Sequence, residues 1–220
     1  RSPPASRCRG RGGARTREAV QSRLDALFPT WRAQQAIEFV DRSAPGARAW
    51  STWRDLARVR DALARALSDR SVPGDAAVAI VMRQRPVMVA AELGAMSLGR
   101  TALLLSPLQA DRALAVEVDS LRAAVLVAHI REWDRPAFAD AVASSGALGL
   151  SLSDDGALSV RMDIPVVQPG PEYDAAVTVL TSGTTGPPKR LPVDWATFSA
   201  LGGGPTGREP KSGKRALILS

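Results

Sequence analysis

The stretch AAVTVLTSGTTGPPK, residues 175–189, contains two segments of opposite character. Residues 175–180 are apolar and carry β-branched side chains, a composition that predicts a buried β-strand. Residues 181–189 consist mainly of Thr, Ser, Gly and Pro, which indicates a loop. The sequence therefore predicts a buried strand that ends in a polar, glycine-containing loop.

The composition of this loop suits the binding of phosphate. Four hydroxyl groups can donate hydrogen bonds to phosphate oxygens, two glycines let the backbone approach an anion closely, and a lysine adds a compact positive charge. Because Pro187 and Pro188 precede the lysine and favour an extended exit, this is not a Walker loop, whose lysine leads directly into a helix. The alternative is a polar turn between two strands, since turns use the same residue types. The candidate phosphate-binding residues are Thr181, Ser182, Gly183, Thr184, Thr185, Gly186 and Lys189.

Outward from the loop, helical and strand patterns alternate along the chain. Apolar residues at spacings of three and four predict helices, and short continuous apolar runs predict strands buried on both faces of a parallel sheet. This alternation predicts an α/β fold with a layered, mostly parallel sheet flanked by helices. We expect helices at about 17–28, 52–70, 85–98, 109–121, 134–144 and 194–201, and strands at 36–40, 76–82, 101–106, 123–128 and 175–180.

Two local patterns add detail to this expectation. Thr52-Trp53-Arg54-Asp55 has the spacing of a capping box, in which the threonine and aspartate side chains satisfy each other's backbone amides, so a helix should begin there. Residues 148–172 contain short apolar pieces separated by Asp154-Asp155-Gly156 and by Pro165, a pattern that indicates a hairpin.

Length and composition are those of a soluble globular protein, with 220 residues, 45% of them hydrophobic and 23% charged. Most of the formal net charge of +7 lies in residues 1–23, which hold seven arginines and one acid. The rest of the chain is close to neutral, which argues against a basic, polyanion-binding body. We expect residues 1–23 to form a disordered Arg-rich head and residues 24–220 to form the folded part.

The sequence argues against a disulfide-bonded protein, most zinc-binding proteins and a membrane-spanning protein. The lone cysteine, Cys8, cannot form an internal disulfide, and with a lone histidine, His129, it leaves no set of ligands for most zinc sites. His129 has no recognisable catalytic partner, and we interpret it as structural or solvated. No apolar run approaches the roughly 18 residues of a membrane span. The sequence predicts a cytoplasmic protein with no membrane span and no metal site made by its side chains.

The nine residues from Thr181 to Lys189 resemble the phosphate-binding signature of the adenylate-forming (AMP-binding) superfamily, which includes acyl-CoA synthetases, the adenylation domains of peptide synthetases, and luciferases. Two upstream segments are similar to weaker motifs of that family. Thr52–Leu56 looks like its Thr-Trp-x-Glu-Leu helix start, and residues 72–80 look like its Pro-Gly-Asp-x-Val turn into a buried strand. The likeness covers about residues 36–220.

The resemblance implies a fold and an activity. Residues 24–220 would be a partial N-terminal AMP-binding (adenylation) domain, an incomplete part of the large domain that is truncated after the phosphate loop. The whole enzyme would be an acyl-CoA synthetase-like ligase that activates a small-molecule carboxylate with ATP and Mg²⁺. It would then pass the acyl group to a thiol such as coenzyme A, as in fatty acid metabolism. The seven loop residues would bind the ATP phosphates, and none would be an acid or base.

The chain departs from the family pattern in two ways. Arg190 stands where the signature has glycine, which adds a second positive charge beside Lys189 but removes backbone freedom. The family segments that hold adenine and ribose, and the small domain with its catalytic lysine, lie beyond this loop and are absent from the 220 residues. We therefore expect the chain alone to be inactive, with Arg215–Ser220 forming the strand that precedes the acyl pocket.

Alternatives from other classes stay open. The chain could be a small non-catalytic module that binds phosphate-bearing ligands or nucleic acid, or its Arg-rich head could bind RNA. Gly202–Gly207 fits the pattern G-x-G-x-x-G, but it follows a helix and leads toward a strand, the reverse of the dinucleotide-binding order. We interpret it as a surface loop. Translation beyond Ser220 would separate a ligase from a complete small protein.

Overall fold

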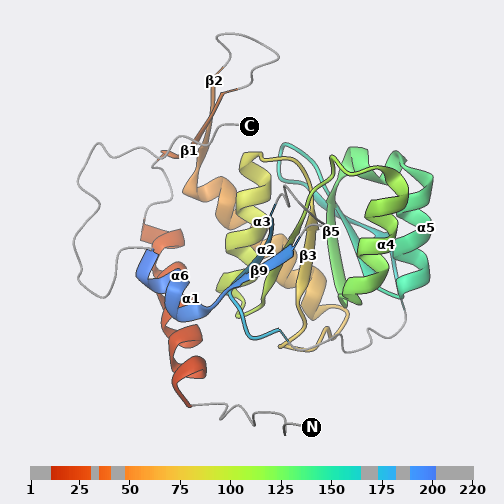
Figure 1. The fold of residues 1–220 in the computed structure, drawn as a ribbon. Helices are drawn as coiled ribbons and strands as arrows, with labels where there is room; N and C mark the ends of the chain where they lie inside the picture. The colour runs from red at the N-terminus through yellow and green to blue at the C-terminus, as the bar shows by residue number, and fades with distance from the viewer. Residues whose placement is uncertain (1–10, 31–34, 41–47, 165–172, 182–188, 202–220) are drawn as a thin grey trace, which may run out of the picture.

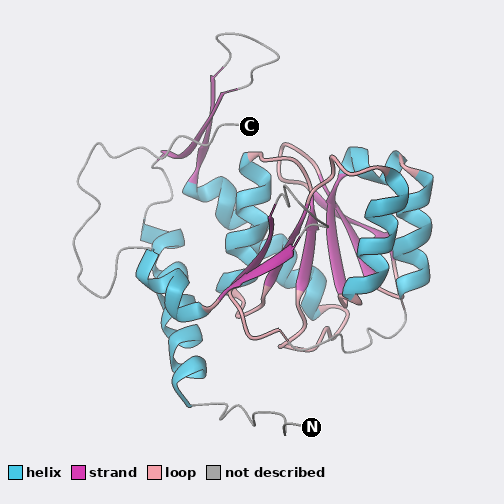
Figure 2. Cartoon of the chain, in the orientation of Figure 1, coloured by secondary structure: helices cyan, strands magenta, loops and turns pink. Residues whose placement is uncertain are grey.

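The computed structural model describes residues 11–30, 35–40, 48–164, 173–181 and 189–201, which Figure 1 draws in colour and Figure 2 by type of structure. Its helices are α1 (Arg11–Thr30), α2 (Trp53–Ser68), α3 (Pro86–Ser97), α4 (Asp111–Leu121), α5 (Pro136–Ser145) and α6 (Trp195–Leu201), with a 3₁₀ helix η1 (Ile130–Asp134). Its strands are β1 (Gln35–Val40), β2 (Arg48–Thr52), β3 (Val78–Val81), β4 (Ala102–Leu105), β5 (Val125–His129), β6 (Leu148–Leu152), β7 (Leu158–Met162), β8 (Val177–Thr181) and β9 (Lys189–Val193).

Seven of these strands form one sheet in the order β7-β6-β5-β3-β4-β8-β9. The five inner strands are parallel to one another. The edge strands are antiparallel to their neighbours, β7 to β6 and β9 to β8. The predicted α/β fold with a mostly parallel sheet is confirmed. β1 and β2 form a separate antiparallel pair.

The sheet is covered on both faces, and the central strand shows this directly. In β3, Val78 and Ile80 belong to a core cluster that also contains residues of α1, α2 and α3. The alternate residues Ala79 and Val81 belong to a second cluster, which contains residues of α4 and α5. Because side chains alternate across a strand, a strand buried on both faces must be apolar throughout, as β3 is.

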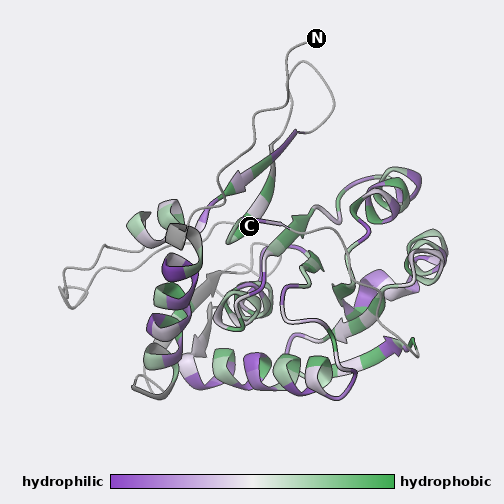
Figure 3. Ribbon diagram, turned by 90° about the horizontal axis from the view of Figure 1, so that it is seen from below, coloured by the Kyte–Doolittle hydropathy of each residue, from purple (hydrophilic) through white to green (hydrophobic). Residues whose placement is uncertain are grey.

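The helices form a layer on each side of the sheet (Figure 1). Contacts between α2 and α3 dominate one layer, and contacts between α4 and α5 dominate the other. In Figure 3, hydrophobic and hydrophilic residues alternate around the helices, as expected where one side of a helix meets the core and the other meets water. The four buried residues of α2, at spacings of three and four, are Leu56, Val59, Leu63 and Leu67.

The capping box predicted before α2 is confirmed. The Thr52 hydroxyl accepts a hydrogen bond from the Asp55 backbone N–H at 3.3 Å, and the Asp55 carboxylate accepts one from the Thr52 N–H at 2.8 Å. The hydrogen bond from the Thr52 backbone N–H to the Asp55 carboxylate contributes most to lowering the pKa of Asp55. The helix therefore begins where the sequence predicted.

The turn from α3 into β4 depends on two residues with different functions. Gly99 has φ +72, a left-handed conformation that side chains with a Cβ rarely adopt. The next residue, Arg100, is only 7% exposed, and its guanidinium donates to the carbonyls of Pro73, Ala76 and Val72. Its burial lowers its pKa. Arg100 thus joins the loops before β3 and β4 at the amino ends of the strands.

The structure corrects the sequence prediction at the N-terminal side. Helix α1 begins at Arg11, so residues 11–23, which composition assigned to a disordered head, are helical, and the helix expected from apolar spacing at about 17–28 is confirmed. The physical reason is tertiary: Val20, Leu24 and Phe28 form a buried stripe against the first core cluster. Composition weighs the arginines of this segment but does not register that stripe.

The remaining predictions concern strands and turns, and one of them is confirmed. The hairpin expected within 148–172 is formed by β6 and β7. Strands β2 and β9 lack a continuous apolar run and were not predicted, and η1 precedes the helix that we expected from residue 134. The loop at 202–207 and the strand expected at 215–220 lie outside the described residues.

Candidate functional site

The predicted phosphate-binding motif, residues 181–189, begins at the carboxyl end of β8 and ends at the first residue of β9. In the antiparallel ladder of these two strands, Thr181 is paired with Lys189. The motif therefore lies between the two arms of a hairpin, and this pair closes it. Of the predicted site residues, the structure places Thr181 and Lys189, while Ser182, Gly183, Thr184, Thr185 and Gly186 lie outside the described residues.

The position of this pair in the sheet favours ligand binding. β8 is parallel to β4, with Ala102 paired with Val177 and Leu103 with Thr178, so Thr181 lies at the edge where the parallel strands have their carboxyl ends. Open α/β sheets bind ligands outside this edge. Lys189 is exposed there.

Arg190 is directed away from the side of the sheet that Lys189 faces. Val193, which shares its face of β9 with Lys189, packs against the core cluster of α1, α2 and α3. Arg190 lies on the opposite face and contacts Glu117 and Ser120 of α4. The expectation that Arg190 supplies a second charge beside Lys189 is therefore wrong, because successive residues of a strand point to opposite faces.

A second polar cluster lies at the carboxyl edge between β3 and β5. The helices that follow these neighbouring strands, α3 and α5, pack in opposite layers, which makes this the topological switch point of the sheet. Arg85, just before α3, forms an ion pair with Asp154 in the β6–β7 turn at 2.7 Å. Asp154 also lies 3.2 Å from Nε2 of His129, at the end of β5.

This cluster is internally satisfied. His129 is 4% exposed, its Nδ1 accepts a hydrogen bond from the Arg131 backbone N–H at 3.4 Å, and its Nε2 contacts Asp154. The interpretation of His129 as structural agrees with this geometry, although the sequence spacing did not indicate Asp154 as its partner. Asp154 is 25 residues further along the chain, and only the hairpin β6–β7 brings it to His129.

The loop between β4 and α4 lies at the same edge and is held by Arg135, at the start of α5. The Arg135 guanidinium donates to the carbonyls of Pro107 and Gln109, and it forms an ion pair with Asp111. Sequence reasoning did not single out this arginine, because a single basic residue before a helix carries no pattern. Its contacts give the carboxyl edge a preorganised backbone beside β4.

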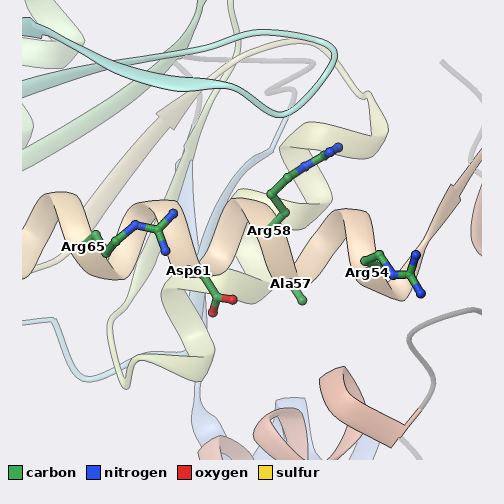
Figure 4. Close-up of a pocket in the computed structure, with 5 residues that line it drawn as sticks. All are labelled: Arg54, Ala57, Arg58, Asp61 and Arg65. Atoms are coloured by element: carbon green, nitrogen blue, oxygen red, sulfur yellow. The ribbon is translucent and has the colours of Figure 1, made fainter.

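A separate hollow of about 410 Å³ runs along α2 (Figure 4). Its charged groups are largely engaged elsewhere: Asp61 forms an ion pair with Arg60, and Arg58 forms one with Asp55. None of its described lining residues belongs to the phosphate motif or to the carboxyl edge, so we assign it no part in phosphate binding. The described lining residues are Arg54, Ala57, Arg58, Asp61 and Arg65.

Two structural findings bear on other kinds of site. Among the residues that the structure describes, no group of three or more His, Cys, Asp and Glu side chains is arranged to hold a metal ion. The described helices include none with the length and apolar character needed to cross a membrane.

The fold and the hairpin together define an α/β protein with a mostly parallel sheet, in which a Thr/Ser/Gly-rich motif follows the carboxyl end of a parallel strand. The family described as AMP-binding enzyme matches residues 31–201. The chain therefore belongs to the AMP-binding enzymes, the adenylate-forming superfamily that the motif resembles. A comparison with curated proteins gives no match.

Several solved structures share this fold. ATP-bound MatB from Rhodopseudomonas palustris matches with a TM-score of 0.61 and 18% identity, over 83% of this chain and 36% of MatB. A long-chain-fatty-acid-CoA ligase from Archaeoglobus fulgidus matches with a TM-score of 0.56 and 18% identity, over 83% of this chain and 38% of the ligase. A luciferase-like enzyme from the mealworm Zophobas morio matches with a TM-score of 0.57 and 11% identity, over 83% and 44%. The chain thus spans well under half the length of these proteins.

Proposed function

We propose that this chain is part of an ATP-dependent carboxylate ligase of the acyl-CoA synthetase type, and that the motif between β8 and β9 binds the phosphates of ATP. The observation that carries the proposal is the position of this motif: it begins at the carboxyl end of a parallel strand and closes on the pair Thr181–Lys189. Membership of the AMP-binding enzymes supports the same assignment.

The proposed reaction has two steps. A carboxylate oxygen of the substrate attacks the α-phosphorus of ATP, forming an acyl–phosphate bond while the bond to the β-phosphate oxygen breaks and pyrophosphate leaves. The sulfur of a thiol such as coenzyme A then attacks the acyl carbon, forming a thioester as AMP leaves and the thiol loses its proton. Mg²⁺ would enter with ATP as a substrate complex, since magnesium is commonly held by substrate phosphates.

The residues of this chain would contribute binding and charge. The hydroxyl groups of Thr181, Ser182, Thr184 and Thr185 would donate to the β- and γ-phosphates, and Lys189 would neutralise part of their charge. Gly183 and Gly186 would allow the backbone to approach the phosphates. None of these groups is proposed to transfer a proton.

We further propose that the 220 residues alone do not catalyse adenylation. The chain spans 36% of MatB and 38% of the archaeal ligase, which supports the view that other parts of the enzyme complete the site. The reading frame downstream of Ser220 tests this. An aromatic-Gly-x-Thr-Glu segment and a Thr-Gly-Asp segment in frame are expected, whereas an immediate stop codon would favour a small non-catalytic module.

A binding experiment tests the assignment of the motif. The purified chain is titrated with MgATP by calorimetry, alongside Lys189→Ala and the control Arg161→Ala, which removes an exposed arginine from β7 at the opposite end of the sheet. We expect Lys189→Ala to weaken binding about tenfold, the loss of one charge-assisted contact, and Arg161→Ala to leave it unchanged. Equal affinity of all three proteins would contradict the assignment.

The same preparation tests for activity. Carboxylate-dependent exchange between ATP and labelled pyrophosphate is measured over a panel of aliphatic and aromatic acids. We expect no exchange by the 220-residue chain and exchange by a protein extended along the downstream reading frame. Exchange by the short chain would show that it is a complete catalyst.

A further inference from the structure

Arg190, the residue that follows the phosphate motif, contacts α4 with its side chain. Arg190 Nη2 donates a hydrogen bond to the Ser120 hydroxyl at 3.2 Å and lies 3.5 Å from a Glu117 carboxylate oxygen. The Arg190 side chain is 34% exposed and that of Glu117 only 12%. The ion pair is thus partly buried, a setting in which an arginine contact is stronger than on an open surface.

Glu117 is itself held in position. Its second carboxylate oxygen accepts a hydrogen bond from the Gln109 amide, at 2.5 Å. The same amide donates to the Ser106 carbonyl in the β4–α4 loop. The carboxylate that receives Arg190 therefore has a fixed orientation, and the contact joins β9 to the carboxyl edge near β4.

The strand on the other side of the motif is held by the same helix. Tyr173, four residues before β8, donates its phenolic O–H to the Leu121 carbonyl at the end of α4, at 3.0 Å. Burial raises the pKa of Tyr173, while the nearby Arg190 acts in the opposite direction. Both arms of the hairpin, the entry before β8 and the exit in β9, are therefore attached to α4 by polar contacts.

From these contacts we infer that Arg190 is a positioning residue, which through Glu117 and Ser120 holds the β9 end of the phosphate-binding hairpin, and with it Lys189, against α4. The inference rests on the proposed phosphate-binding function of the motif. Arg190 does not touch the phosphates: its charge is on the opposite face of β9 from Lys189, and its effect passes through the backbone between the two residues.

Arg190 could act by positioning β9 or by its positive charge, and the two roles predict opposite effects of Glu117→Gln on anion binding. If Arg190 acted only as a positive charge near the phosphates, Glu117→Gln would remove an opposing negative charge and strengthen the binding of an anion. If Glu117 orients Arg190, the same substitution releases β9 and weakens binding. The sign of the Glu117→Gln effect therefore separates the two roles.

The experiment measures the dissociation constant for MgATP by calorimetry in the 220-residue chain and its variants. We expect Arg190→Ala and Glu117→Gln each to weaken binding about fivefold, the equivalent of one partly exposed ion pair. The double variant should be no weaker than either single one, because both break the same contact. Arg190→Lys should recover part of the affinity, and Arg161→Ala, on the other edge strand, should have no effect.

Three results would overturn the inference. Tighter or unchanged binding in Glu117→Gln would assign Arg190 a role through charge alone, and additive losses in the double variant would show that the two residues act separately. Normal binding in Arg190→Ala would show that β9 needs no such contact. If neither the 220-residue chain nor the protein extended along the downstream reading frame binds MgATP, the proposed function of the motif fails, and the positioning role fails with it.

Discussion

The centre of the sheet and its β8–β9 edge differ in exposure and in chemistry. All four residues of β3 are buried, and so are all five of β5. In β9, by contrast, the first four residues are exposed, and Lys189 and Arg190 are charged. A strand with helices on both faces holds mainly apolar side chains, whereas an edge strand has room for charge. Stability is therefore concentrated in the centre, and the proposed phosphate binding lies at the edge.

This comparison predicts that substitutions in the centre change stability and that those at the edge change binding. The largest expected effect is at Phe138 of α5, which is fully buried in the second core cluster. Phe138→Ala should lower the free energy of unfolding by about 3–5 kcal/mol, because it leaves a cavity. Urea unfolding followed by circular dichroism measures this. A loss below about 1 kcal/mol, comparable to that of the exposed control Val116→Ala, would contradict the assigned core.

The next largest effect is expected at Arg100, at the amino ends of the strands. Arg100→Leu should cost about 2–3 kcal/mol, because three carbonyls that accept hydrogen bonds from the guanidinium lose their donor. The same urea series measures it, and MgATP affinity measured below the unfolding transition should be unchanged. A stable Arg100→Leu protein would show that water replaces the guanidinium at these carbonyls.

Glu92 on α3 makes the stability of the buried part of the chain depend on pH. Burial raises its pKa from 4.5 to about 7, so between these values the folded chain binds more protons than the unfolded chain. Stability from this group is therefore highest below pH 4.5 and is lost as the pH rises toward 7. Relative to the native chain, Glu92→Gln should gain about 1–2 kcal/mol of stability between pH 5 and pH 8. Parallel pH profiles for the two proteins would contradict the raised pKa.

The smallest effect on stability is expected at the edge. Lys189→Ala should change the free energy of unfolding by no more than about 0.5 kcal/mol, since its side chain is exposed on the last strand of the described sheet. This is the same variant that we expect to lose MgATP affinity. Substantial unfolding of Lys189→Ala would make the edge a part of the stabilising core and would remove the contrast with β3.

Local sequence patterns were sufficient wherever one short segment contains the whole signal. The Thr52–Asp55 box predicted the start of α2, and the apolar run of residues 76–82 predicted β3. Both depend on neighbouring residues only, either hydrogen bonds three residues apart or side chains that alternate between two buried faces. The hydroxyl- and glycine-rich motif indicated its family for the same reason: all nine residues are contiguous.

Long-range contacts explain what the sequence did not predict. β9 has no apolar run, and it is a strand because β8 offers it an antiparallel partner with Thr181 opposite Lys189. Residues 11–16 precede the helix that we expected at about 17–28, and they continue α1, whose buried stripe meets a core built by other elements. Composition and periodicity are evaluated over a short window of sequence. That window does not include the distant segment that supplies the hydrogen bonds or the apolar surface.

The sequence by itself determined the class of fold and the family, because alternating apolar periods and a contiguous signature are properties of the chain, and it predicts the phosphate-binding residues. Only the tertiary structure decided which partners the charged residues Arg190 and Asp154 contact. It places Arg190 against Glu117, 73 residues earlier, and Asp154 against His129. An ion pair depends on the distance between two side chains in space, and for residues far apart in the chain that distance is set by the order and register of the strands.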